Sequence, residues 1–160
     1  MDNKEMYNEV IQFAINNEQE AVDLYTKMAN TTQSPSGKIL FNDLADMERG
    51  HKTKLEKLNT GYFSSQELKS PEDLKISEYL VDVALKPDSS YQEILIFAAK
   101  SEKAAFDLYT DLADIYTSTP EIRKMFQVLA QEEAYHKLML EREYDDVVLS
   151  ENWTLIFKIL

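Results

Sequence analysis

Cysteine is absent from this chain of 160 residues, which excludes disulfide bonds, thiolate-bound metals, iron–sulfur clusters and cysteine nucleophiles. Histidine occurs only twice, so a metal site must draw most of its ligands from carboxylate oxygens. Turn-forming residues are also scarce, with three glycines and four prolines. That composition favours a few long helices over many short strands.

Positive charge is in short supply as well. The 17 lysines and arginines face 29 aspartates and glutamates, and the net charge of −12 argues against a nucleic-acid or anionic-membrane partner. The first residues lack the apolar core of a signal peptide, and no run approaches the roughly 20 apolar residues of a membrane span. We therefore expect a cytoplasmic protein that binds neither nucleic acid nor membrane.

Apolar residues spaced by threes and fours predict four long helices, at about residues 3–30, 35–59, 90–117 and 120–145. Start signals support two of them: Ser34 precedes a proline, and Ser90 stands three residues before Glu93. Residues 60–89 show no sustained period but are long enough to cross the length of a bundle. We expect one all-α domain over residues 1–147, an antiparallel four-helix bundle with its crossover at about 60–89.

The two halves of the chain form an internal repeat. Residues 7–29 and 91–113 are identical at 11 of 23 positions, and residues 39–58 and 124–143 are identical at 8 of 20. A duplicated helical hairpin explains both matches. The predicted bundle therefore consists of two homologous hairpins.

Six ionisable residues occupy helix positions that would otherwise be apolar: Glu18, Glu48, His51, Glu102, Glu133 and His136. Four carboxylates in one core need compensation by cations or protons, and two divalent metal ions would balance them. Residues three apart share a helical face, so Glu48 with His51, and Glu133 with His136, can each offer one oxygen and one nitrogen to an ion. Such ligands suit iron or manganese.

Other interpretations of the same residues stay open at this point. A single Glu-x-x-His pair on a helix is usually a solvated polar pair rather than a metal ligand. The six residues can also form a buried network without metal, although that arrangement leaves a surplus of buried negative charge.

This pattern resembles the ferritin-like diiron-carboxylate proteins, and among them the rubrerythrin family, over roughly residues 3–145. The resemblance implies a ferritin-like fold and two iron ions, with manganese or a mixed pair as alternatives, bound by those six residues. It also implies that Tyr25 and Tyr109, each seven residues after a ligand glutamate, hydrogen-bond ligand carboxylates. The expected activity is reduction of hydrogen peroxide.

Two departures from the family pattern bear on that activity. Rubrerythrins proper carry a cysteine-ligated rubredoxin domain, whereas this chain has no cysteine, so we expect an external electron donor such as a rubredoxin-like protein. The third helix of the family usually offers a second carboxylate three residues after the first, where this chain has Ala105. An oxygen-dependent ferroxidase or iron-handling protein, and a metal-free helical interaction module, are the alternatives.

Two further features are not explained by a metal site. Residues 148–160 form an apolar tail, which we expect to dock on its own bundle or on a second copy of the chain in a homodimer. Gly50 lies inside a predicted helix at a cost of about 1 kcal/mol relative to alanine. It either permits a close approach near the site or is tolerated at the surface.

Overall fold

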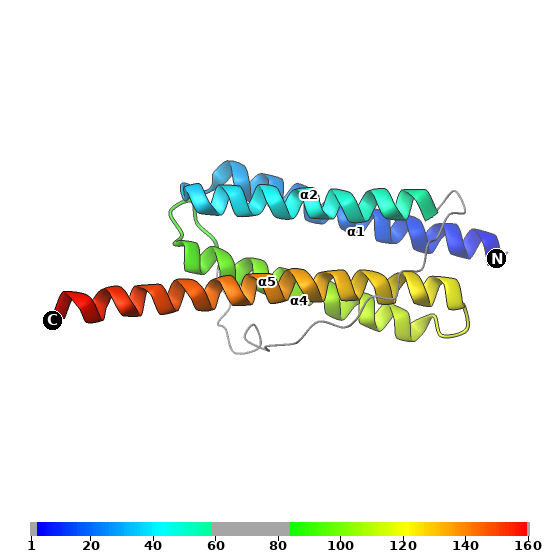
Figure 1. Ribbon diagram of the computed structural model, residues 1–160. Helices are drawn as coiled ribbons and strands as arrows, with labels where there is room; N and C mark the ends of the chain where they lie inside the picture. The colour runs from blue at the N-terminus through cyan, green and yellow to red at the C-terminus, as the bar shows by residue number, and fades with distance from the viewer. Residues whose placement is uncertain (1–2, 59–83, 160) are drawn as a thin grey trace. The chain divides into compact units, whose positions relative to one another are not determined.

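The computed structural model describes residues 3–58 and 84–159, with side chains described over 8–57 and 84–150. Within these residues the chain forms four α-helices and no strand (Figure 1): α1 (Asn3–Thr31), α2 (Pro35–Leu58), α4 (Tyr91–Ile115) and α5 (Pro120–Ile159). The prediction of an all-α protein is confirmed. The chain divides into two compact units, residues 1–67 and 68–160, and each holds one pair of helices.

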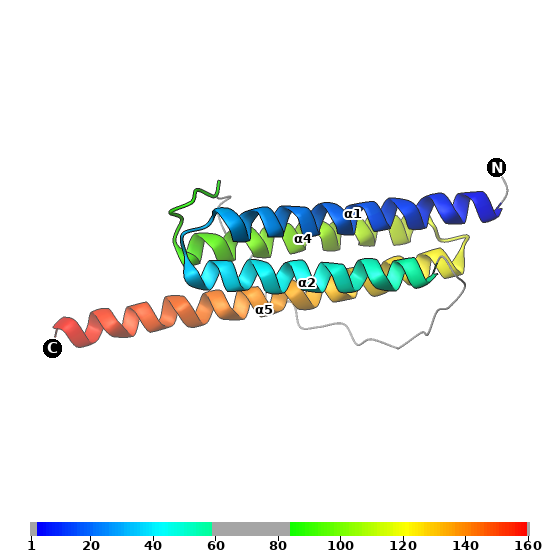
Figure 2. The same cartoon turned by 90° about the horizontal axis from the view of Figure 1, so that it is seen from above.

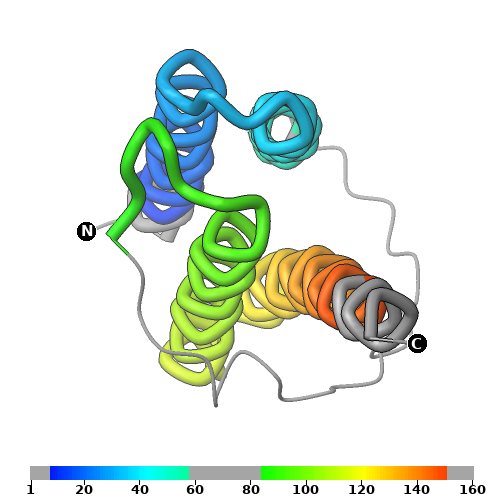
Figure 3. Tube along the Cα trace, turned by 90° about the vertical axis from the view of Figure 1, so that its left-hand side faces the viewer, coloured from blue at the N-terminus to red at the C-terminus, as the bar shows by residue number. Residues whose placement is uncertain are grey.

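The first unit is a hairpin in which α1 and α2 lie antiparallel, side by side (Figure 2). A short loop joins the two helices, as the view along them shows (Figure 3). Ser34 caps α2, because its Oγ accepts a hydrogen bond from the amide of Gly37 at 3.1 Å. Pro35 occupies the first helical position, where its fixed φ suits a helix and its missing N–H costs nothing.

The second unit is the corresponding hairpin of α4 and α5. Ser90 and Glu93 form the predicted capping box at the start of α4, with the Ser90 amide donating to Glu93 Oε2 at 2.8 Å. The α4 helix ends at Ile115, where the amide of Tyr116 still donates to the carbonyl of Leu112 at 3.1 Å. Pro120 opens α5 as Pro35 opens α2.

Each hairpin contains an equivalent aromatic pair that packs its two helices against each other. Tyr25 stacks on Phe41 with ring centroids 6.1 Å apart, and Tyr109 stacks on Phe126 at 5.9 Å. All four rings are almost fully buried. The offsets of 84 and 85 residues between these pairs are those of the sequence repeat. The prediction of two homologous helical hairpins is therefore confirmed.

The last helix differs from the prediction, because α5 continues to Ile159 instead of ending near residue 145. The acidic run around Asp145 and Asp146 interrupts the apolar period, but it contains neither proline nor glycine, so nothing ends the helix there. Within the helix, the hydroxyl of Ser150 donates to the carbonyl of Val147 at 2.8 Å. The predicted docking of the tail depends on side chains beyond residue 150, which lie outside the described part.

The predicted crossover lies mainly outside the described residues as well, since 59–83 are not described. Its last part turns at Pro87 and Asp88, and the Ser89 amide donates to the carbonyl of Lys86 at 3.1 Å. Among residues 3–58 and 84–159, no helix combines the length and the apolar composition that crossing a bilayer requires.

Candidate metal centre

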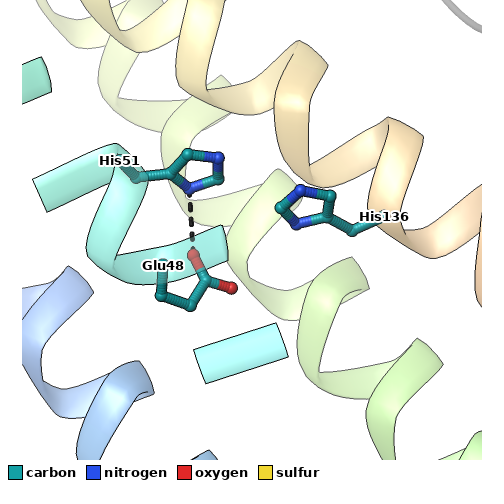
Figure 4. A group of neighbouring side chains, drawn as sticks. All are labelled: Glu48, His51 and His136. Carbon is teal, nitrogen blue, oxygen red and sulfur yellow. Dashed lines mark ion pairs between the residues drawn. The ribbon is translucent and has the colours of Figure 1, made fainter. Parts of the chain in front are cut away.

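The first hairpin presents three of the predicted ligands together. Glu18 comes from α1, Glu48 and His51 come from α2, and their side chains are only 2–4% exposed. The Nδ1 atom of His51 lies 2.9 Å from a carboxylate oxygen of Glu48 (Figure 4) and 3.4 Å from one of Glu18. One nitrogen thus faces carboxylates from both helices of the hairpin.

Helical spacing explains why these polar groups point inward. On α2, Glu48 and His51 continue the stripe of Phe41, Leu44 and Leu55, which are buried. On α1, Glu18 lies in the same stripe as Ile11 and Ala14, which are completely buried. The apolar residues at either end hold the carboxylates away from water.

The second hairpin repeats this arrangement with Glu102 from α4 and with Glu133 and His136 from α5. The two glutamates are 1% exposed and His136 is 8% exposed. The Nδ1 atom of His136 lies 3.0 Å from Glu102 and 3.2 Å from Glu133. In each hairpin one atom from each of the three residues can be chosen so that all lie within 4.8 Å of one another.

Electrostatics in the second hairpin favour a positive charge between the carboxylates. Burial opposes protonation of the imidazole, but hydrogen bonds and attraction from Glu102 and Glu133 outweigh it and raise the pKa of His136 to about 10. Burial also raises the pKa of Glu102 to about 7, although the hydrogen bond from His136 works in the opposite direction. At neutral pH an imidazolium proton therefore stands where a metal cation would bind.

Each hairpin thus offers two carboxylates and one imidazole around a point that needs positive charge. A proton on histidine supplies one positive charge, and two carboxylates require two. A divalent cation would satisfy both carboxylates and use the imidazole as a neutral ligand. The donor set fits a metal that accepts oxygen and nitrogen ligands, such as iron.

The two predicted tyrosines are both buried, at 2% exposure. Their rings pack on the phenylalanines of the neighbouring helix, as described above. Hydrogen bonding of their hydroxyls to ligand carboxylates stays a prediction. Ala105, one turn after Glu102 on α4, is half-buried and brings no carboxylate to this hairpin.

Sequence reasoning missed a buried pair of opposite charges on α5, in addition to Glu133 and His136. Lys137 is 4% exposed and Glu141 is completely buried, and Lys137 Nζ lies 3.8 Å from Glu141 Oε1. An i,i+4 pair of this kind normally lies on a solvated helix face, which is why the spacing alone gave no signal. The clue was their position beside Glu133 and Leu140, on the edge of the apolar stripe.

Comparison with known proteins decides the family. The family model for rubrerythrin matches residues 9–85 and 93–158, which is most of the chain. The chain belongs to the rubrerythrin family. The resemblance drawn from the Glu-x-x-His pairs is thereby confirmed, and with it the ferritin-like fold class.

This member of the rubrerythrin family is also similar to one solved structure, a hypothetical protein from Pyrococcus furiosus. The two share 25% sequence identity with a TM-score of 0.55, over 91% of this chain and 90% of the other. A comparison with curated proteins gave no match. Family membership and the two Glu/His sets together support a metal-binding protein of the diiron type.

Proposed function

We propose that the two hairpins combine their ligand sets and bind two iron ions, with manganese as the alternative metal. The observation behind this proposal is the duplication itself: each hairpin buries two carboxylates and one imidazole with nearly equal spacing. Four buried carboxylates, once all are ionised, carry four negative charges, which two divalent ions balance. Similarity to the Pyrococcus furiosus structure extends over 91% of the chain, so it includes both hairpins.

We further propose that the protein reduces hydrogen peroxide with electrons from an external donor, such as a rubredoxin-like protein. Bound iron would supply the two electrons that convert one peroxide and two protons into two water molecules. The protein residues would bind the metals, fix their orientation and exclude bulk water, since the apolar stripes on either side of the ligands are buried. The 160 residues contain no cysteine, so no cysteine-bound redox centre within them can relay electrons.

One feature of α4 is equally compatible with a different use of the same metals. With Ala105 in place of a second carboxylate, α4 has no neighbouring ligand to exchange for Glu102 one turn away. A fixed ligand set suits an oxygen-dependent ferroxidase or iron-handling protein as well as a peroxidase. A metal-free helical interaction module is the third candidate, and it predicts no metal uptake at all.

Rapid mixing of the anaerobic, iron-loaded protein with hydrogen peroxide and, separately, with oxygen tests these functions. The proposed peroxidase should be oxidised faster by peroxide and should turn over when reduced rubredoxin is added. Faster oxidation by oxygen would favour the ferroxidase instead. The Glu20→Ala variant is a matched control, because Glu20 is an exposed neighbour of Glu18 on α1 and should leave both rates unchanged.

A further inference from the structure

The buried ion pair of Lys137 and Glu141 on α5 has no part in the proposed function so far. We call these two residues the α5 pair; their charged atoms are 3.8 Å apart, and their side chains are 5% and 0% exposed. Glu133, Lys137 and Glu141 follow one another at intervals of four residues, so they share one face of α5. The α5 pair therefore continues the row that begins with a predicted metal ligand.

The first hairpin contains the equivalent pair in a different environment. Lys52 and Glu56 of α2, which we call the α2 pair, precede the α5 pair by 85 residues, the offset that also relates the two Glu-x-x-His pairs. Lys52 Nζ lies 3.7 Å from Glu56 Oε1, but these side chains are 30% and 52% exposed. Lys52 also donates to Gln19 Oε1 at 2.7 Å. The chain thus holds one solvated and one buried version of the same ion pair.

Helix stability does not explain the α5 pair. A glutamate that precedes a lysine is the more favourable order within a helix, and here the lysine comes first. Taking both charges out of water costs hydration energy, and apolar residues of similar volume are often equally stable in such a position. Burial does increase the range of the charges, because the surrounding medium screens them less than water does. What burial adds is therefore an electric field at neighbouring groups.

The part of α4 that lies level with the α5 pair has an apolar buried face. At one end of this stretch the hydroxyl of Tyr91 donates to Glu143 Oε1 at 2.8 Å. At the other end His136 meets Glu102. The α4 residues that are buried between these two contacts are Ile94, Leu95, Ala98 and Ala99. None of them is charged, so they leave the field of the α5 pair uncompensated on this side.

We propose that the α5 pair sets a fixed positive charge beside the metal position of the second hairpin, where it weakens binding of a divalent ion and favours the reduced state of iron. This inference rests on the proposed function. Lys137 follows His136 directly and lies four residues after Glu133, whereas Glu141 lies eight residues after Glu133. At about 1.5 Å per residue, these separations from Glu133 are about 6 Å and about 12 Å along the helix. The positive end of the pair is therefore the end nearer to the ligands.

A positive charge in this place opposes the addition of more positive charge. It repels a divalent cation, and it repels a trivalent cation more strongly. Iron in the second hairpin should therefore bind more weakly, and its trivalent form should accept an electron from the external donor more readily, than without the pair. Solvent screens the equivalent charge of the α2 pair. The two metal positions are thus unequal, although their ligands are the same.

Titration of the full-length chain with Co²⁺ tests the proposal with an ion that binds to oxygen and nitrogen ligands. A neutral variant, Lys137→Met with Glu141→Gln, removes both charges at nearly constant volume. A reversed variant, Lys137→Glu with Glu141→Lys, keeps the pair but inverts its direction. The affinity of one of the two binding steps should rise about threefold in the neutral variant and at least about tenfold in the reversed variant.

The α2 pair supplies the matched control. Lys52→Met with Glu56→Gln makes the same change at the equivalent, partly exposed positions, and it should change both Co²⁺ affinities less than about twofold. Midpoint potentials of the iron-loaded proteins give a second readout, whose order a merely structural role would not set. The potential should be highest in the natural chain and the control, lower in the neutral variant and lowest in the reversed variant.

The neutral variant decides the outcome if the reversed variant does not fold, because replacing both members of a buried ion pair is usually tolerated. Equal Co²⁺ affinities of the natural chain and the folded neutral variant would overturn this inference and leave the proposed function intact. An equal rise in affinity in the α2 control would also overturn it, because burial would then make no difference. A natural chain that binds no Co²⁺ would instead overturn the proposed function, and this inference with it.

Discussion

His136 and Glu102 lie 34 positions apart in the sequence, yet the Nδ1 atom of His136 is 3.0 Å from a carboxylate oxygen of Glu102. The contact joins α5 to α4, and it is almost completely buried. His51 stands in the same relationship to Glu18 in the first hairpin, at 3.4 Å. In each half of the molecule, an imidazole thus links the two helices through their carboxylates.

The metal-free protein should lose stability as the pH rises. The folded state raises the pKa of His136 from 6.5 to about 10, so this contribution is complete below pH 6.5 and is lost as the pH rises through about 10. It also raises the pKa of Glu102 from 4.5 to about 7, so that contribution is present below pH 4.5 and is lost as the pH rises through about 7. Both effects have the same sign, and thermal melts between pH 5 and pH 9 should show it.

Metal binding supplies the control for that pH series. A divalent cation takes the place of the imidazolium proton, so saturating metal should raise the melting temperature most at the alkaline end and flatten the pH dependence. A metal-free protein whose melting temperature rises between pH 5 and pH 9 would contradict the assignment of the proton to His136.

Removal of the stacked ring in the second hairpin should destabilise it strongly. Phe126 is completely buried and lies against Tyr109 and Tyr116, each with a ring-centroid distance of 5.9 Å. We expect Phe126→Ala to lower the free energy of unfolding by about 3–5 kcal/mol. Phe13→Ala is the control, because Phe13 is 46% exposed, and its cost should be about 0.5 kcal/mol or less. If urea denaturation gave Phe126→Ala and Phe13→Ala the same cost in the free energy of unfolding, burial of the ring would not determine that cost.

The capping box of α4 makes a smaller, separable contribution. Ser90→Ala removes the side chain that accepts the Glu93 amide at 3.2 Å, and it should cost about 1 kcal/mol in the free energy of unfolding. Ser90→Asp keeps an acceptor at this position and should cost much less. If alanine and aspartate have the same effect in denaturant titrations, the cap is not the source of the stability.

Tyr25→Phe distinguishes a packing role from a role in ligand orientation. The phenyl ring retains the stack on Phe41, so the stabilisation of the metal-free protein by ring packing should be kept. If the hydroxyl orients a ligand carboxylate, iron affinity should fall by about 10–100-fold. Unchanged iron affinity would reduce Tyr25 to a packing residue, and Tyr109→Phe tests the second hairpin in the same way.

Much of this architecture could be predicted from the sequence, because the informative residues are local signals. Ser90 and Glu93 mark a helix start by their spacing, and Glu48 and His51 share a face by theirs. The approach of His136 to Glu102 is different, because it depends on the register between α4 and α5. Packing of Tyr109 on Phe126 sets that register, and the spacing of residues within one helix contains no information about it.

The missed features have similar physical causes. Burial of Lys137 and Glu141 depends on what surrounds α5 and not on their own i,i+4 spacing, which is equally common on solvated helices. The continuation of α5 to Ile159 was missed because the apolar period is interrupted near Asp145, although no helix-breaking residue follows. Loss of periodicity removes evidence for a helix without being evidence that the helix ends.

Iron stoichiometry of the reconstituted protein tests the central claim most directly. Two ligand sets that act together should take up about two iron ions per chain, and Glu18→Ala or His136→Ala should abolish stoichiometric binding while Glu20→Ala has no effect. Normal iron loading of Glu18→Ala and His136→Ala, or uptake of less than about a tenth of an ion by the natural chain, would contradict the account.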